Sequence, residues 1–111
     1  MSIASLVIHK LSAKDIECQL LEQGDSTRRE VNGRRYSPPE VAVGYTFENE
    51  NVSDETIADK LAELILQKVA LCSNQVGGRG KAYVTLREAV KITEEGLEDC
   101  VRYCAVSVLV V

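Results

Sequence analysis

The chain has 111 residues and a mass of 12.2 kDa, the length of a single domain. Hydrophobic residues make up 45% and charged residues 27%. These are ordinary values for a soluble globular protein, so wholesale disorder and collagen-like repeats are excluded. Because 13 Lys and Arg are outnumbered by 17 Asp and Glu, with a formal charge of -4, the surface as a whole is unsuited to coating nucleic acid, although a local basic patch is compatible with this charge.

The two apolar ends do not have the pattern of targeting signals. The stretch 3–8 has no basic residue before it and no small-residue cleavage site after it. The C-terminal run 106–111 is far shorter than a membrane-spanning segment. We therefore expect a cytoplasmic protein, or a virion component if the chain is viral, with no membrane partner.

The segment 2–23 is consistent with two structures. Apolar residues recur at helical spacing in its first half, at Ile3, Leu6, Val7 and Leu11. The stretch 12–15 resembles the capped start of a second helix that would run to Gly24. However, Ile16, Cys18 and Leu20 alternate as they would in a strand. We predict helix with a break near Ser12, and strand remains the alternative.

A turn signal follows the N-terminal segment. Asn32-Gly33 is typical of a type I′ β-hairpin, which would pair residues 28–31 with residues 34–36. Pro38-Pro39 then forces an extended entry into the next strand.

Two segments, 40–48 and 82–92, alternate as strands with one face on a core do. In the first, one face carries Val41, Val43, Tyr45 and Phe47. In the second, the residues predicted to share a face are Ala82, Val84, Leu86, Val90 and Ile92. The charged, Gly-containing segment 93–99 predicts a turn that leads antiparallel into the last strand.

The clearest predicted helix runs from about Asp54 to Cys72. Ser53 is a good N-cap, and Asp54 and Glu55 place negative charge on the first turn. Apolar side chains recur every three or four positions, at Ile57, Leu61, Leu64, Ile65, Val69 and Cys72. So little of the helix is polar that a sheet, a neighbouring subunit or both must cover it. The glycine-rich segment 77–80 is predicted to be a flexible connector.

The last strand, from Cys100 to Val111, is apolar on both faces after Arg102 except at Ser107. Such a strand is normally central in a sheet and covered on both sides. Because one helix covers only one face, we expect a second helix or a partner on the other. The residues predicted to form an interface between copies are Val106, Val108, Leu109 and Val110.

Basic residues gather near predicted turns of this acidic chain. The six concerned are Arg28, Arg29, Arg34, Arg35, Arg79 and Lys81. The hairpin would bring its Arg pairs together, and Arg offers planar bidentate donors to phosphate groups or carboxylates. Three interpretations stay open for this cluster: a solvated hairpin, a site for a protein partner, and a site for nucleotide or nucleic acid.

The sequence contains no recognisable catalytic, metal or cofactor motif. The cysteines, Cys18, Cys72, Cys100 and Cys104, form no Cys-x-x-Cys pair, and His9 is the one histidine. Along a strand, Cys100 and Cys104 would lie about 13 Å apart, too far for a disulfide. The segment 76–81 lacks the first glycine and the hydroxyl residue of a phosphate loop. We therefore interpret the protein as non-enzymatic and expect no cofactor.

The order of elements resembles that of the tail-terminator and neck proteins of tailed phages. It consists of a strand, an acidic loop, a helix, an alternating strand, a turn and a final apolar strand. The resemblance is carried by residues 41–47, 57–69, 82–92 and 101–111. It is one of pattern and transfers no functional residues. It implies a small α+β subunit whose sheets meet in a ring, with a non-enzymatic joining role.

Together, these patterns predict one α+β domain, residues 1–111, with a mainly antiparallel sheet of four to five strands and one principal helix on a face. The leading hypothesis is a non-enzymatic assembly module that self-associates, with a phage structural joining role as its specific form. The alternative is a nucleotide- or nucleic-acid-binding module that uses the Arg-rich hairpin.

Overall fold

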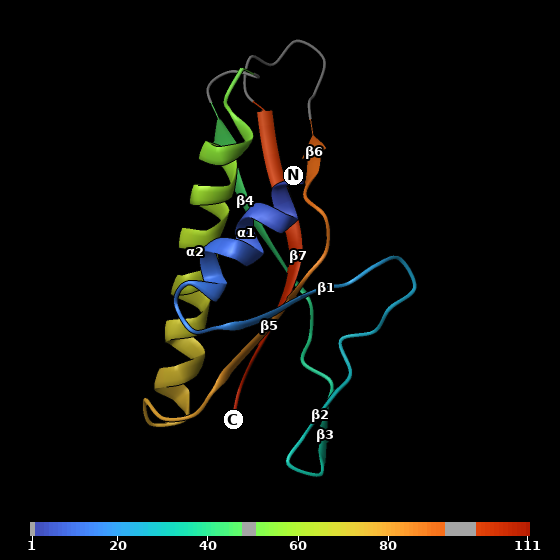
Figure 1. Cartoon of the computed structure of the whole chain (residues 1–111), viewed down its shortest axis with the longest axis vertical. Helices are drawn as coiled ribbons and strands as arrows, with labels where there is room; N and C mark the ends of the chain where they lie inside the picture. The colour runs from blue at the N-terminus through green and yellow to red at the C-terminus, as the bar shows by residue number, and fades with distance from the viewer. Residues whose placement is uncertain (1, 48–50, 93–99) are drawn as a thin grey trace.

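The computed structural model describes residues 2–47, 51–92 and 100–111, which have an α+β architecture (Figure 1). The described elements are α1 (Ile3–Ser12), β1 (Glu17–Leu20), β2 (Arg29–Val31), β3 (Arg34–Tyr36), β4 (Val41–Phe47), α2 (Asp54–Gln75), β5 (Ala82–Leu86), β6 (Val90–Ile92) and β7 (Cys100–Val110). The predicted fold class is confirmed. The predicted turn 93–99 lies outside the described residues.

The main sheet is organised around β7. Its strand order is β1-β5-β7-β4, and β6 pairs with β7 beyond the end of β5. On one side of β7, β4 runs antiparallel, with Val41 opposite Val106. On the other side, β5 and β6 are also antiparallel to β7. The parallel pair β1–β5 makes the sheet mixed. The sequence-based expectation that the last strand is central is therefore correct.

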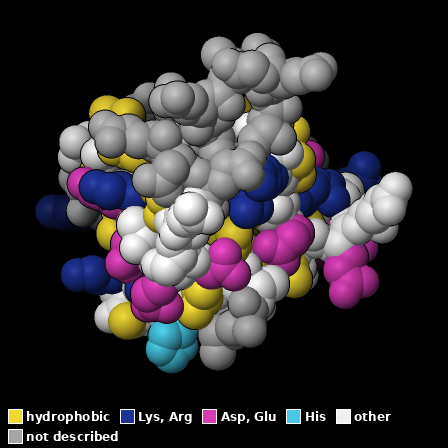
Figure 2. All heavy atoms as spheres, turned by 90° about the horizontal axis from the view of Figure 1, so that it is seen from above, with side chains coloured by type: hydrophobic (Ala, Val, Ile, Leu, Met, Phe, Trp, Pro, Cys, Tyr) yellow, Lys and Arg dark blue, Asp and Glu magenta, His cyan; other side chains and the backbone are white. Residues whose placement is uncertain are grey.

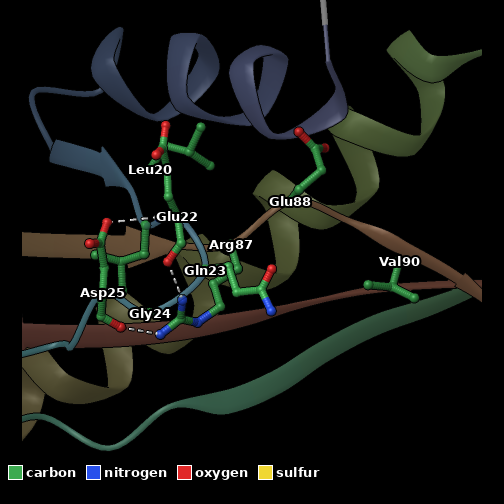
Figure 3. Close-up of a pocket in the computed structure, with 9 residues that line it drawn as sticks. Leu20, Glu22, Gln23, Gly24, Asp25, Arg87, Glu88 and Val90 are labelled. Atoms are coloured by element: carbon green, nitrogen blue, oxygen red, sulfur yellow. Dashed lines mark hydrogen bonds between the residues drawn. The ribbon is translucent and has the colours of Figure 1, made fainter.

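Both helices pack on one face of this sheet, called here the inner face (Figures 1 and 3). Val7 and Leu11 of α1 and Leu61 and Ile65 of α2 are fully buried there. They form one core with the inner-face strand residues Val43, Val84, Leu86, Cys104 and Val106. The second helix thus shares the face that α2 covers, and neither helix covers the opposite, outer face.

The helix ends are fixed by side chains. Ser53 accepts a hydrogen bond from the Thr56 backbone N–H at 3.2 Å, so the predicted N-cap of α2 is confirmed. The helix continues to Gln75, three residues beyond the predicted end, and stops where Gly77 takes a positive φ of 82°. In α1, the Ser5 N–H donates to the Ser2 hydroxyl at 3.1 Å.

The prediction of a second helix over 12–24 is wrong. Asp15 adopts a positive φ of 61°, which ends the helical path, and the next residues pair with β5 as β1. Ile16 and Leu21 at the two ends of β1 are buried. The strand alternative prevails because pairing with β5, far along the chain, satisfies the backbone groups of this segment.

The prediction that Val90 and Ile92 share a face with Val84 and Leu86 is also wrong. Leu86 lies opposite Val106, but Val90 lies opposite Tyr103, so three residues (87–89) face two residues of β7. This is a β-bulge, and the extra residue reverses the side-chain alternation. Val84 and Leu86 are at most 1% exposed, whereas Val90 and Ile92 are 46% and 44% exposed on the outer face.

The predicted hairpin is confirmed. β2 and β3 pair antiparallel across Asn32 and Gly33, whose φ values are 52° and 79°. Positive φ at both central residues is the type I′ geometry that fits the twist of two paired strands. In Figure 1 this hairpin lies away from the helices, at the lower end of the molecule.

Candidate interaction surfaces

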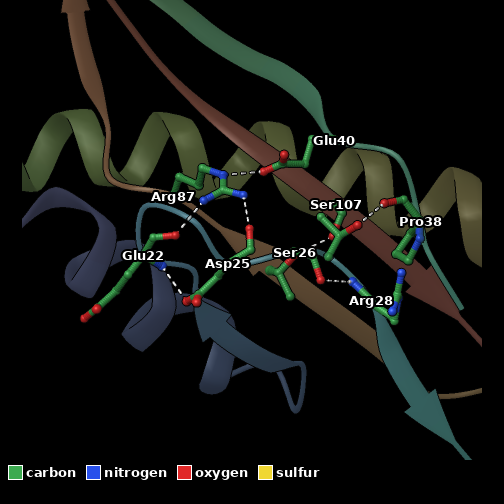
Figure 4. A network of polar contacts seen from close by, with 10 residues as sticks. Glu22, Asp25, Ser26, Arg28, Pro38, Glu40, Arg87 and Ser107 are labelled. Atoms are coloured by element: carbon green, nitrogen blue, oxygen red, sulfur yellow. Dashed lines mark hydrogen bonds and ion pairs between the residues drawn. The ribbon is translucent and has the colours of Figure 1, made fainter. Parts of the chain in front are cut away.

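The bulge at 87–89 anchors two other parts of the chain. Arg87 donates to the Glu40 carboxylate at 2.7 Å and to the carbonyls of Glu22 and Asp25 at 2.7 and 2.6 Å (Figures 3 and 4). These contacts hold the segment 22–40 against the outer face. Glu88 points the other way, toward α1, where its carboxylate accepts from the Ala4 N–H at 3.1 Å. A negative charge there stabilises the N-terminus of α1, whose first turn has no acidic residue.

One half of the outer face is formed by β5 and the C-terminal part of β7, and we call it the lower half because it lies lower in Figure 1. The segment 22–40 covers this half. Thr85 and Ser107, opposite each other on β5 and β7, are 6% and 2% exposed, and their hydroxyls are hydrogen-bonded to each other. Nearby, the Thr27 hydroxyl donates to the Pro38 carbonyl at 2.7 Å, which closes the covering segment on itself (Figure 4). The two buried hydroxyls of this half therefore satisfy each other.

Among the described residues, no segment covers the upper half of the outer face in this way. We call it the open patch, and its strand residues are Ala42, Gly44, Thr46, Val90, Ile92, Val101, Tyr103 and Ala105. The register places Val90, Tyr103 and Gly44 in one row and Ile92, Val101 and Thr46 in the next. A Cβ at Gly44 would lie 3.0 Å from that of Tyr103, so glycine permits this close approach. None of these described strand residues is charged.

A hollow adjoins the open patch at the bulge. It has a volume of about 820 Å³ and is lined by Val90, Arg87, Glu88 and the segment 20–25 (Figure 3). Leu20, at its edge, is 36% exposed. Since Arg87 and Glu88 already bind protein groups, the side chains left to contact an occupant of this hollow are mainly apolar.

The structure divides the six predicted basic residues into separate groups. Arg29 and Lys81 are brought together, because both form ion pairs with Glu17, at 2.8 and 3.2 Å. Both also lie over the ring of Tyr83, at 4.4 and 5.4 Å from its centroid. Arg29 thus fastens the covering segment to the sheet, and Lys81 contacts the same two residues from the turn before β5.

The other four basic residues are left more open. Arg28, Arg34 and Arg35 belong to the exposed hairpin region, and Arg79 lies in the exposed turn between α2 and β5. The hairpin and that turn are on opposite sides of the lower end in Figure 1. The predicted cluster therefore reduces to the three hairpin arginines.

The predicted interface residues of β7 are mostly enclosed by the protein's own chain. Val106 is 0% and Val110 7% exposed, and Val108 packs against the inner-face core. Leu109 is half-buried on the outer face. The most exposed large hydrophobic residues of the described strands are instead Val90 and Ile92, for which the alternation pattern predicts core positions. The charged Glu88, in the middle of an apolar strand face, was the sequence signal for this change.

Two cysteines have thiols that are held protonated. Burial, and secondarily the charge of Glu88, raises the pKa of Cys104 to about 11. Burial, with a smaller effect of Glu17, raises the pKa of Cys18 to about 11. Neither thiol is therefore a nucleophile at neutral pH. His9 is exposed on α1, at the edge of the face seen in Figure 2, and acidic side chains gather near the centre of that face.

Comparison of the chain with protein-family models, curated proteins and solved structures finds no match. No helix in the described part of the chain has the length and apolar character needed to cross a membrane. The function is therefore inferred from the surfaces described above.

Proposed function

We propose that this protein is a non-enzymatic assembly module that self-associates through the open patch. The observation that carries the proposal is the exposure of Val90 and Ile92, at 46% and 44%, beside Tyr103 on a sheet face. Exposed apolar patches on small proteins commonly mark interaction sites. The bulge that exposes these side chains also fixes Arg87 and Glu88, so the exposure is built into the fold.

A second copy fits this patch because the patch is uncharged. The chain as a whole carries a formal charge of -4, so two copies repel each other overall. The strand residues of the open patch carry no charge, and two such faces can pack together as aligned sheets do, without burying an unpaired ion.

The size of the patch sets the expected affinity. Three strands about 4.8 Å apart and about five residues long cover a flat area of roughly 240 Å². A stable dimer buries about 800 Å² per partner. We therefore expect association in the micromolar range or weaker from this patch alone. In a closed ring, as in the phage tail-terminator and neck proteins that the element order resembles, neighbouring contacts would add to it.

Sedimentation velocity over a micromolar to millimolar concentration series tests the proposal. We expect the mean mass to rise with concentration, and Val90→Glu to keep the chain monomeric. Val76→Glu is the matched control, because Val76 is 48% exposed at the end of α2, outside the patch. A wild-type chain that stays monomeric throughout, or equal effects of the two variants, would overturn the proposal.

A second candidate is a nucleotide- or nucleic-acid-binding module that uses the hairpin. It is supported by Arg34 and Arg35, which are exposed on β3 of a hairpin that lies away from the helices. If this candidate is correct, a short oligonucleotide binds in a salt-sensitive manner and the Arg34→Ala, Arg35→Ala double variant binds less. Absence of binding at low salt would remove it.

A further inference from the structure

A second surface lies at the edge of the sheet, along β4. In the described chain β4 pairs with β7 on one side, and its other edge has no strand beside it. The Arg87 N–H donates a hydrogen bond to the Ala105 carbonyl, and the backbone groups of Lys81 and Val111 exchange two hydrogen bonds. The odd-numbered residues of β7 therefore direct their backbone N–H and C=O groups toward β5. The even-numbered ones face the odd-numbered residues of β4. The N–H and C=O groups of Ala42, Gly44 and Thr46 therefore point outward.

This edge lacks the usual protection against strand pairing. Proteins commonly block an edge strand with a charge, a proline or a bulge. β4 has seven residues, Val-Ala-Val-Gly-Tyr-Thr-Phe, with none of these features. The two prolines precede the strand and leave its outward groups free to pair.

The open edge is accompanied by a groove between β4 and α2. One hollow of about 320 Å³ lies beside residues 42–44 and Leu71, and a second of about 250 Å³ lies beside Val41 and Val108. Lys68 lines both hollows, so they lie next to each other, and the two together are called here the β4 groove. Leu71, at 62%, is the most exposed of the large hydrophobic side chains described.

The charge of the groove indicates its occupant. Lys68 is the one charged residue lining either hollow, and it has no ion-pair partner among the described residues. Two turns earlier on α2, Lys60 lies over the Tyr45 ring at 5.5 Å and forms an ion pair with Glu63 at 4.0 Å, so it is already partnered. A second copy placed edge to edge about a two-fold axis would bring Lys68 toward its own counterpart. A segment carrying a carboxylate would pair with Lys68 instead.

We propose that the β4 groove binds an extended, carboxylate-bearing segment of another protein, added as a new strand to β4. Backbone hydrogen bonds to Ala42, Gly44 and Thr46 supply the affinity, as in other strand-addition complexes. Alternate side chains of the segment point toward α2, where Leu71 takes an apolar one and Lys68 takes the carboxylate. The segment uses the outward backbone groups of β4 and the side that faces α2, whereas the open patch is the outer face of the same strand, so the two surfaces adjoin at Ala42, Gly44 and Thr46.

The test uses a fluorescent synthetic peptide that alternates valine and threonine and carries one central glutamate. Anisotropy is measured against the full chain, with two matched peptides: one with lysine for glutamate, and one N-methylated at alternate amides. We expect the glutamate peptide to bind at least about tenfold tighter than either control. Equal binding by the N-methylated peptide, or no binding by any peptide, would overturn the proposal.

Three variants locate the site. Lys68→Glu is expected to reverse the preference to the lysine peptide. Ala42→Pro removes one outward N–H without touching the ladder to β7, so it should weaken binding about tenfold while circular dichroism and the melting temperature show a folded chain. Val90→Glu should leave peptide binding unchanged, which separates this result from self-association. If Lys68→Glu, which lies outside the open patch, instead changes self-association of the chain alone, a second copy is the occupant and the proposal is wrong.

Discussion

The two halves of the outer sheet face share the central strand β7 but have opposite surroundings. In the lower half, Thr85 and Ser107 are buried under the segment 22–40, while in the upper half Val90 and Ile92 are exposed. Thus the polar side chains are covered and the apolar ones are open, the reverse of what hydrophobicity alone predicts. The bulge at 87–89 separates the halves, since Arg87 holds the covering segment and the extra residue turns the valine and isoleucine outward.

The largest effect on stability is expected from deletion of Ala89. The bulge would then become a regular pairing in which Leu86 still lies opposite Val106 and Val90 still lies opposite Tyr103, so Val90 and Ile92 stay on the outer face. The backbone at Arg87 and Glu88 would straighten, and the contacts that these two side chains make from the bulge would be lost. We therefore expect the free energy of unfolding to fall by about 3 kcal/mol and self-association to be retained. Chemical denaturation and sedimentation velocity measure the two effects. Ala89→Gly keeps the residue count and should lose much less stability, and equal losses in both variants would contradict the role of the bulge in holding these contacts.

Release of the covering segment is expected to lower the free energy of unfolding by the next largest amount. Arg87→Met keeps an apolar stem but removes the contacts to Glu40 and to the carbonyls of Glu22 and Asp25. We expect a loss of about 2 kcal/mol, because these partly exposed, charge-assisted bonds are replaced by water. Amide hydrogen exchange should become faster at Ser107 and stay unchanged at Ile65. Unchanged exchange at Ser107 would show that the segment is held by other contacts.

The buried hydroxyl pair of Thr85 and Ser107 tests whether the segment 22–40 keeps water away from the lower half. Ser107→Ala alone leaves the Thr85 hydroxyl buried without its partner, which should lower the free energy of unfolding by about 1–2 kcal/mol. Adding Thr85→Val removes both polar groups and should restore most of that loss. A double-mutant cycle by urea denaturation measures the coupling. Additive effects of the two substitutions would mean that the segment 22–40 does not exclude water from this pair.

The inner face gives the smallest predicted effect, at alkaline pH. The folded-state pKa of Cys104 lies near 11, above the ordinary value of 9.0, so its protonated form is favoured by folding. This contribution is complete below pH 9 and is lost as the pH rises toward 11. The stability lost between about pH 8 and about pH 10 should be about 1 kcal/mol smaller in Cys104→Ala than in the wild type. Equal losses in both proteins would contradict the raised pKa.

Much of the fold could be predicted because its signals are local. Ser53 and the three-to-four-residue spacing after it define α2, and Asn32-Gly33 defines the hairpin. The last strand is recognisable as central because it is apolar on both faces. β1 is not predictable in this way, because its four residues are held by parallel pairing with β5, a contact between distant segments that has no local signature.

The candidate surfaces were less predictable, since each depends on register. Val90 and Ile92 have the alternation of core residues, and one extra residue reverses it. Glu88 signalled the interruption, because a charge in the middle of an apolar face needs a partner, here the N-terminus of α1. The basic residues were grouped by sequence proximity, whereas Arg29 and Lys81 are joined through Glu17 and Tyr83.

By itself, the sequence determined which segments form α2, the hairpin and the alternating strands, because caps, turn residues and apolar periodicity act within a few residues. Only the tertiary structure decided that both helices cover the same face, that the bulge turns Val90 and Ile92 outward, and that β4 keeps an open edge. Those outcomes depend on which distant backbone groups pair, and a shift of one residue in that pairing exchanges a buried side chain for an exposed one.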